Sequence, residues 1–147
     1  MNKYVRFGVM IFTSTLIMYF LMFLNVYESG HVVFSQTRLF MALIMGSVMS
    51  VVMLLFMWKM YDDRKKNIII MISSVLLFLM SLYLVRSQST VDEVSWMRAM
   101  IPHHSSAILT SERAQLEDPR VRKLAEEIIE AQKREIDEME KLIEELR

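Results

Sequence analysis

The chain begins with three long apolar runs separated by short polar segments, and then changes into a charged tail. The runs cover residues 7–25, 39–58 and 67–85, and none of them contains Asp, Glu, Lys or Arg. Because about 20 helical residues cross the roughly 30 Å core of a bilayer, each run predicts a transmembrane helix. The first run is long for a signal peptide and lacks a small-residue cleavage pattern, which favours an uncleaved anchor. Residues 1–86 are therefore predicted to form a three-span transmembrane domain.

Residues 87–147 are predicted to form a helical hairpin. Thr90 and Glu93 are spaced as a capping box, which predicts a first helix over residues 91–115. Asp118 followed by Pro119 is a second start signal and predicts a helix over residues 119–146. Pro102 falls inside the first helix and is expected to bend it, because proline removes a backbone hydrogen bond. The short turn makes the two helices antiparallel, so the fold class expected for the whole chain is all-α.

Spacings of three and four residues predict the face that each helix turns toward the other. In the first helix this seam is Met97, Met100, His104, Ala107, Ser111 and Ala114. In the second helix it is Val121, Ala125, Ile128, Gln132, Glu135, Met139, Leu142 and Leu146. Folding the hairpin about residue 117 brings the polar and sulfur-bearing side chains of both seams to one level. This layer contains Met97, Met100, His104, Gln132, Glu135 and Met139. His103 lies about 100° around the helix from His104 and could face a second hairpin.

Basic residues near the ends of the runs predict the orientation in the membrane. Lys3 and Arg6, with four further Lys and Arg residues in the 59–66 loop, lie on one side, whereas Arg38 and Arg86 lie on the other. Since cytoplasmic loops carry the excess of Lys and Arg, the N-terminus is expected in the cytoplasm and the hairpin outside it. In a bacterium this means a multi-pass protein of the inner membrane with a periplasmic or extracellular hairpin. His31, in the short outer loop, is expected to be a solvated loop residue.

The composition excludes several classes of function. The chain has no cysteine, which rules out disulfides, thiolate metal sites and cysteine nucleophiles. The formal net charge is zero, so nothing favours nucleic acid as a partner. The sequence has no Gly-rich phosphate loop and no nucleophile–base pair, and we therefore expect no enzymatic activity.

The layer around His104 has the chemistry of a metal site. Adjacent histidines do not share one helix face, unlike the paired histidines of a zinc protease helix, and the Glu-x-x-His pair of di-iron bundles is absent. Imidazole and thioether with a nearby carboxylate and amide favour copper, and Cu(I) in particular, while zinc suits methionine less well. The alternative is that Met97 and Met100 only fill the core and that His104 is a hydrogen-bonded seam histidine.

The hairpin resembles the domain of unknown function 305 family. The resemblance covers residues 94–143 and rests on Met100-Ile-Pro-His-His104, Asp118-Pro-Arg-Val-Arg122 and the Gln132-x-x-Glu135-Ile-x-x-Met139 pattern. It implies a ferritin-like helical bundle, with copper binding and copper tolerance outside the cytoplasm. The matching positions are His103, His104, Met100, Gln132, Glu135 and Met139. Thr110 stands where many members carry methionine, and many members contain two hairpins rather than one.

A single hairpin exposes its seam, which predicts association with a second copy. Two hairpins from two chains complete a four-helix bundle, so we expect a homodimer or a higher even oligomer. The alternative is that the hairpin packs on its own membrane helices or on another protein.

The second apolar run carries a methionine at every fourth position. These residues are Met41, Met45, Met49, Met53 and Met57. Each step overshoots a full turn by about 40°, so the stripe spirals around the helix. It resembles the second span of copper uptake channels and could conduct Cu(I) by thioether exchange, although methionine is also an ordinary filler of irregular gaps.

Together these patterns predict a membrane-anchored metal-binding protein, with copper as the metal. The expected role is sequestration, sensing or handover outside the cytoplasm. A copper conduit through the methionine-rich span is one alternative, and a structural or protein-interaction module without metal is another. A separate metal-handling protein could be a further partner, besides the lipid bilayer.

Overall fold

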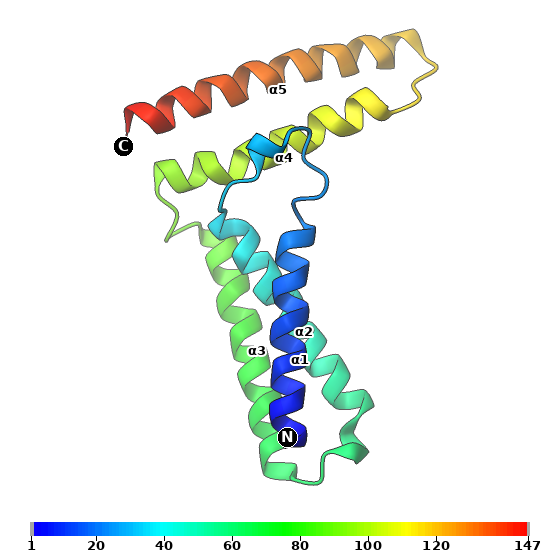
Figure 1. The fold of residues 1–147 in the computed structure, drawn as a ribbon, viewed down its shortest axis with the longest axis vertical. Helices are drawn as coiled ribbons and strands as arrows, with labels where there is room; N and C mark the ends of the chain where they lie inside the picture. Colours follow the sequence, from blue (N-terminus) through cyan, green and yellow to red (C-terminus); the bar gives the residue numbers. More distant parts are fainter. Residues whose placement is uncertain (1, 147) are drawn as a thin grey trace. The chain divides into compact units, whose positions relative to one another are not determined.

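The computed structural model describes residues 2–146, which form five α-helices and no β-strand. The helices are α1 (Lys3–Leu21), α2 (Gln36–Phe56), α3 (Arg64–Ser87), α4 (Glu93–Arg113) and α5 (Pro119–Glu145), with short 3-10 turns η1 (Ser29–His31) and η2 (Trp58–Met60) (Figure 1). The predicted all-α class is confirmed. The chain divides into a membrane unit, made of residues up to Met22 with Thr37–Thr90, and a hairpin unit, made of Phe23–Gln36 with the residues from Val91 onward.

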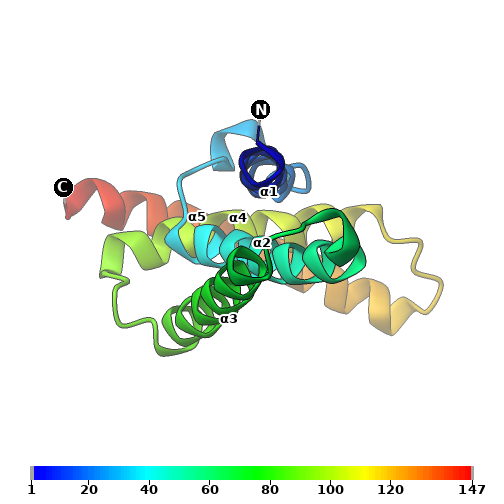
Figure 2. The same ribbon diagram turned by 90° about the horizontal axis from the view of Figure 1, so that it is seen from below.

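Helices α1, α2 and α3 of the membrane unit are each long and apolar enough to cross a membrane, as the three runs predict. Their ends follow from local capping. The Asn2 side chain accepts from the Tyr4 N–H at the start of α1, and Asp63 accepts from the Lys65 and Lys66 N–H groups at the start of α3. Large side chains such as Phe12 and Ile69 point outward, as expected for helices whose surroundings are hydrocarbon. In Figure 2 the ribbon is turned so that α1 is seen end-on.

Small residues allow α1 and α2 to approach each other closely. Ala42, Gly46 and Ser50 recur at every fourth position of α2, and all three are buried. A Cβ atom at Gly46 would lie 2.2 Å from Thr15 Oγ1, so only glycine leaves room for α1 at this point. Nearby, the Ser74 hydroxyl of α3 donates to Ser50 Oγ at 3.0 Å, which satisfies two polar groups inside the three-helix packing.

In the hairpin unit, α4 and α5 pack antiparallel around an apolar core. The buried members of this core are Met97, Ile101, Ile108, Ile136, Met139 and Ile143. Asp118 caps α5 and Pro119 occupies its first turn, as the sequence predicts. The N-cap of α4 is Asp92 rather than Thr90, because the Asp92 carboxylate accepts from the Ser95 N–H at 2.7 Å, and α4 therefore begins at Glu93. Helix α4 continues through Pro102.

The buried seam differs from the predicted one. Met97, His104 and Met139 are buried as predicted, but Ile101, Ser105, Ile108, Ile136 and Ile143 share the interior with them. Several predicted seam residues are exposed instead, namely Ala114, Val121, Ile128, Leu142 and Leu146. The reason is that the apolar arc of α5 is wider than one partner helix can cover. Helix α4 covers the part of the arc that contains Ile136, Met139 and Ile143, and the predicted seam shares Met139 but extends to the exposed side with Ile128 and Leu142.

Residues 23–36 pack against the hairpin, although the sequence assigns them to the transmembrane domain. The Tyr27 N–H donates to Ser105 Oγ at 2.6 Å, and His31 Nδ1 lies 2.8 Å from the same hydroxyl oxygen. The Lys133 ammonium lies 5.4 Å from the centre of the Tyr27 ring. His31 is therefore a half-buried packing residue and not the solvated residue that was expected.

Candidate metal centre

The centre of the hairpin is a hydrogen-bonded pair between the two helices. His104 Nε2 of α4 lies 2.8 Å from Glu135 Oε2 of α5. His104 Nδ1 lies 2.9 Å from the Met100 carbonyl oxygen, one turn earlier in α4. Because a carbonyl oxygen can only accept, Nδ1 carries the proton and donates it. This leaves Nε2 as the ring nitrogen that faces α5, the arrangement in which a backbone carbonyl orients a metal-ligating histidine.

The imidazole is buried, whereas the carboxylate is half-exposed. His104 lies among the buried residues of α4, and the Glu135 side chain keeps 46% of its surface accessible. Since Nδ1 already donates to the carbonyl, the hydrogen bond between Nε2 and Glu135 requires a second proton, either on Nε2 or on the carboxyl group, and a metal ion between the two atoms would take the place of that proton. Two ligand atoms on one copper or zinc ion, each about 2.0 Å from it, lie more than about 3 Å apart. The pair would therefore have to separate slightly to admit an ion between them.

The predicted sulfur ligands occupy two different environments. Met97 and Met139 are buried within the apolar core of the hairpin. Met100 is half-buried and packs against the same core, and its backbone carbonyl holds His104 in place. Along the helices, Met100 lies one turn before His104 and Met139 lies one turn after Glu135, so a sulfur-bearing residue stands one turn from each member of the pair. Imidazole, carboxylate and thioether together suit copper better than a hard cation.

His103 and Gln132 do not join the pair directly. The His103 ring is exposed, with its centroid 6.2 Å from that of His104 and the two planes nearly perpendicular. Gln132 is half-buried, one turn before Glu135. Over residues 2–146, no three side chains of His, Asp or Glu gather closely enough to enclose a metal ion. One hairpin therefore supplies an incomplete set of nitrogen and oxygen ligands.

The flank of the hairpin beside the His104–Glu135 pair is apolar and exposed. Leu124, Ile128, Glu135 and Leu142 are spaced by four and seven residues and share one side of α5, where Leu124 and Leu142 keep 55% and 41% of their surface accessible. On α4, Trp96 and Met100 are four residues apart, and Trp96 is half-exposed. The opposite flank is the one that Tyr27 and His31 cover.

The methionines of the second span differ in their surroundings. Met41 is exposed, and Met45 and Met49 are half-buried. Met53 and Met57 pack against the buried cluster of Phe7, Leu54 and Tyr61. At least the last two residues of the stripe thus take part in ordinary apolar packing.

Comparison with known proteins identifies the hairpin. The family described as "Domain of unknown function (DUF305)" matches residues 84–146, a range that contains all of α4 and α5 up to Glu145. The chain belongs to the DUF305 family. Uncharacterized protein L153 of Acanthamoeba polyphaga mimivirus is 33% identical over 108 residues, which cover 72% of this chain and 69% of the relative. No solved structure matches the chain.

The similarity to L153 extends beyond the DUF305 region. The family match spans 63 residues, counted from 84 to 146, whereas the similarity to L153 covers 108 residues, so part of it must lie before residue 84. All seven residues predicted to bind metal lie within the DUF305 region. Thr110, where many members carry methionine, turns its hydroxyl back to the carbonyls of Ser106 and Ala107 at 3.0 and 3.1 Å.

Proposed function

We propose that this DUF305 protein is a membrane-anchored copper-binding protein whose site is built around His104 and Glu135. The observation that carries the proposal is the contact between His104 Nε2 and Glu135 Oε2 beside the apolar core of the hairpin. A buried polar pair costs desolvation energy that apolar side chains at the same positions would not, so its presence favours a role beyond packing. The neighbouring thioethers of Met97, Met100 and Met139 favour Cu(I) over zinc.

The site is completed by a second copy of the chain. The exposed apolar flank of α4 and α5 lies beside the His104–Glu135 pair, and a second hairpin placed on this flank forms a four-helix bundle. His103, exposed beside the pair, then faces the partner hairpin. Each pair would be shielded from water, and ligands from two chains would be available to the ion.

The membrane unit supports a location for the copper site outside the cytoplasm. Its three helices are long and apolar enough to anchor the hairpin, and the excess of Lys and Arg at the N-terminus and in the 59–66 loop favours the cytoplasmic side for these two segments. The hairpin then lies on the opposite side of the membrane. An anchored, non-enzymatic copper site outside the cytoplasm fits sequestration, sensing or handover to another metal-handling protein.

A Cu(I) titration tests the proposal. The purified full chain in mild detergent is titrated with Cu(I) against a competing chelator, beside the variants His104→Ala and His31→Ala. His104→Ala is expected to weaken binding by more than about 100-fold, because even loss of a residue that only orients a metal ligand costs about 10- to 100-fold. His31→Ala removes a histidine from the opposite flank and should leave the affinity unchanged. Affinity indifferent to His104→Ala would refute the site and leave the hairpin as an interaction module.

A further inference from the structure

A pocket opens at the end of the membrane unit where α1 begins and α2 ends. Its volume is about 490 Å³, within the range of small-molecule sites. Its apolar wall is formed by Phe7, Met10 and Tyr61, and its basic residues are Lys3, Arg6 and Lys59. Among the described residues that line this pocket, Asp62 is the only acid.

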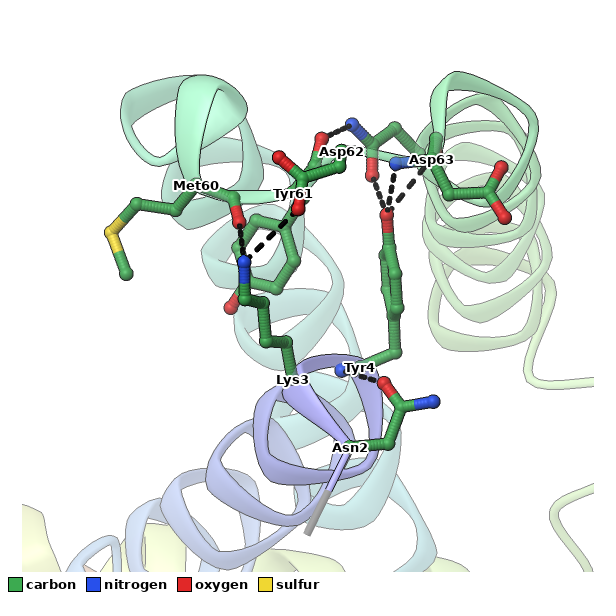
Figure 3. Close-up of polar contacts among 8 residues, drawn as sticks. Asn2, Lys3, Tyr4, Met60, Tyr61, Asp62 and Asp63 are labelled. Atoms are coloured by element: carbon green, nitrogen blue, oxygen red, sulfur yellow. Dashed lines mark hydrogen bonds and ion pairs between the residues drawn. The ribbon is translucent and has the colours of Figure 1, made fainter.

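Two of the three cations in this pocket are available to a ligand. Lys3 Nζ lies 3.0 Å from Asp62 Oδ2 and donates to the Met60 carbonyl oxygen at 3.3 Å, so its charge is already balanced (Figure 3). Arg6 and Lys59 form no ion pair with any residue between 2 and 146. With three cations and one carboxylate, the pocket carries a net charge of +2.

Contacts between separate parts of the chain fix the positions of the pocket walls. The Lys3 contacts join α1 to Met60 of η2 and to Asp62 just after it (Figure 3). The Tyr4 hydroxyl joins α1 to the start of α3 by donating to Asn67 Oδ1 at 3.0 Å. The Tyr61 ring packs on Phe7 with 5.5 Å between centroids. Arg6 and Lys59 therefore lie on anchored segments, so little ordering is needed when a ligand binds.

The pocket also lies where a bilayer changes from headgroups to hydrocarbon. Lys3 starts one candidate span, Lys59 follows the end of another, and the aromatic side chains of Tyr4, Trp58 and Tyr61 lie at the same end, as is usual at a membrane interface. A site with cations and an adjoining apolar wall matches an amphiphile that has an anionic head and a hydrocarbon tail. We propose that this pocket binds the phosphate headgroup of an anionic phospholipid, with Arg6 and Lys59 on the phosphate and Phe7 and Met10 beside the lipid chain.

Two cations outside the pocket provide the control. Arg64 and Lys65 are exposed in the first turn of α3 and do not line the pocket. They lie in the same polar segment as Lys59 and contribute equally to the positive charge that sets topology. Removing two charges from α3 thus matches the removal of two charges from the pocket.

The experiment measures single lipids retained by the full chain. The purified protein in neutral detergent is titrated with phosphatidylglycerol or phosphatidylcholine, and bound lipid is counted by native mass spectrometry. Since each cation near an anionic surface contributes about fivefold, Arg6→Gln/Lys59→Gln should weaken phosphatidylglycerol binding by about 25-fold. Phosphatidylcholine binding should not change, and Arg64→Gln/Lys65→Gln should shift phosphatidylglycerol binding less than about twofold.

Three further outcomes decide against the proposal. Equal losses in both double variants would mean general charge attraction, and unchanged binding in Arg6→Gln/Lys59→Gln would mean that the pocket is not used. Displacement of phosphatidylglycerol by millimolar inorganic phosphate would assign the pocket to a soluble anion instead of a lipid. Arg6→Lys/Lys59→Arg keeps both charges and should retain binding. Because Lys59 is exposed, Lys59→Gln alone should fold as the wild type does, so weaker binding by this variant reports the loss of charge and not a loss of fold. The hairpin metal site plays no part in this inference.

Discussion

His104 Nε2 of α4 and Glu135 Oε2 of α5 lie 2.8 Å apart, and this contact joins the two hairpin helices near their middle. The same imidazole donates from Nδ1 to the Met100 carbonyl. Both ring nitrogens therefore have partners, and the orientation of the ring is fixed before any metal arrives.

Removing the carboxylate should destabilise the hairpin even without metal. Glu135→Ala leaves the buried His104 Nε2 without a partner, and an unsatisfied buried polar group costs about 1–3 kcal/mol. Glu135→Gln should cost less, since its amide can still hydrogen-bond. The comparison is made by thermal melting of the metal-free chain, followed by circular dichroism. Gln132→Ala, one turn away and half-buried, is the control. A Glu135→Ala melt identical to that of the wild type would mean that the contact adds nothing to stability.

The two halves of the apolar arc of α5 should respond differently to substitution. Ile136 keeps 3% of its surface accessible and faces α4, so Ile136→Ala should cost about 2–5 kcal/mol of stability. Leu124→Ser/Leu142→Ser changes exposed residues and should instead weaken association between two chains while preserving helix content. Sedimentation velocity in detergent measures the second effect. Glu126→Ser/Glu130→Ser, on the polar side of α5, is the matched control, and a wild type that is already monomeric would contradict the two-chain bundle.

The start of α5 should depend on pH in the acid range. The Arg120 guanidinium, and then the Arg120 backbone N–H, hold the pKa of the Asp118 carboxyl below its ordinary value. A carboxyl whose pKa is lower in the folded state stabilises the fold above its unfolded pKa of about 3.9, and this stabilisation is lost as the pH falls through the folded pKa. Hairpin stability should therefore fall below about pH 4.

Asp118→Asn tests this pH dependence because it retains a cap but cannot titrate. Its stability should change less than that of the wild type between pH 5 and pH 2, as followed by thermal melting. Asp137→Asn, an exposed acid away from the start of α5, should melt with the same pH profile as the wild type. Identical profiles for wild type and Asp118→Asn would show that another group is responsible.

Gly46 should be intolerant of any side chain. Its Cβ position lies 2.2 Å from Thr15 Oγ1 and 3.2 Å from Thr15 Cβ, so Gly46→Ala must push α1 away and should cost about 1–3 kcal/mol. Thr15→Ala in the same chain should recover part of that loss. Melting of the detergent-solubilised protein checks both effects. Gly8→Ala, where nothing lies within 4 Å of the new atom, should melt like the wild type.

The packing of residues 23–36 should depend on one hydroxyl. Ser105 is fully buried, and Ser105→Ala leaves the Tyr27 N–H without its acceptor. Loss of a hydrogen bond worth about 1 kcal/mol should speed amide exchange at Tyr27 by about fivefold. Hydrogen exchange measured by mass spectrometry resolves this segment from α4 and α5, which should be protected as before. Ser106→Ala changes a neighbouring hydroxyl that bonds only within α4, and Tyr27 exchange should be unaffected.

Local patterns in the sequence predict the helices well. Long apolar runs give the three spans, and Asp118 with Pro119 gives the start of α5. The contact between His104 and Glu135 also follows, because folding the hairpin at a known turn fixes which residues lie at the same level. These features depend on nearby residues and on helix geometry, and both can be read from spacing.

The rotation of α5 and the packing of residues 23–36 do not follow from spacing. Ile128 and Ile129 are both apolar and adjacent on the helix, and periodicity cannot decide which of them faces α4. The packing of Tyr27 depends on a hydroxyl 78 residues away, and a single serine in a helix gives no sign of that role. Ser105 and His31 were missed for this reason.

The connection between Tyr27 and Ser105 also has a consequence for biosynthesis. Tyr27 leaves the ribosome well before its partner, since 78 residues separate the two. At about 5–20 residues per second, roughly 4–16 s pass before Ser105 is made. During that interval the segment between the first two spans has no hairpin to pack on, and Tyr27 lacks both the Ser105 hydroxyl and the Lys133 ammonium. In a nascent chain stalled after α3, this segment would stay accessible to proteases. It would become protected once the hairpin is complete and packs on it.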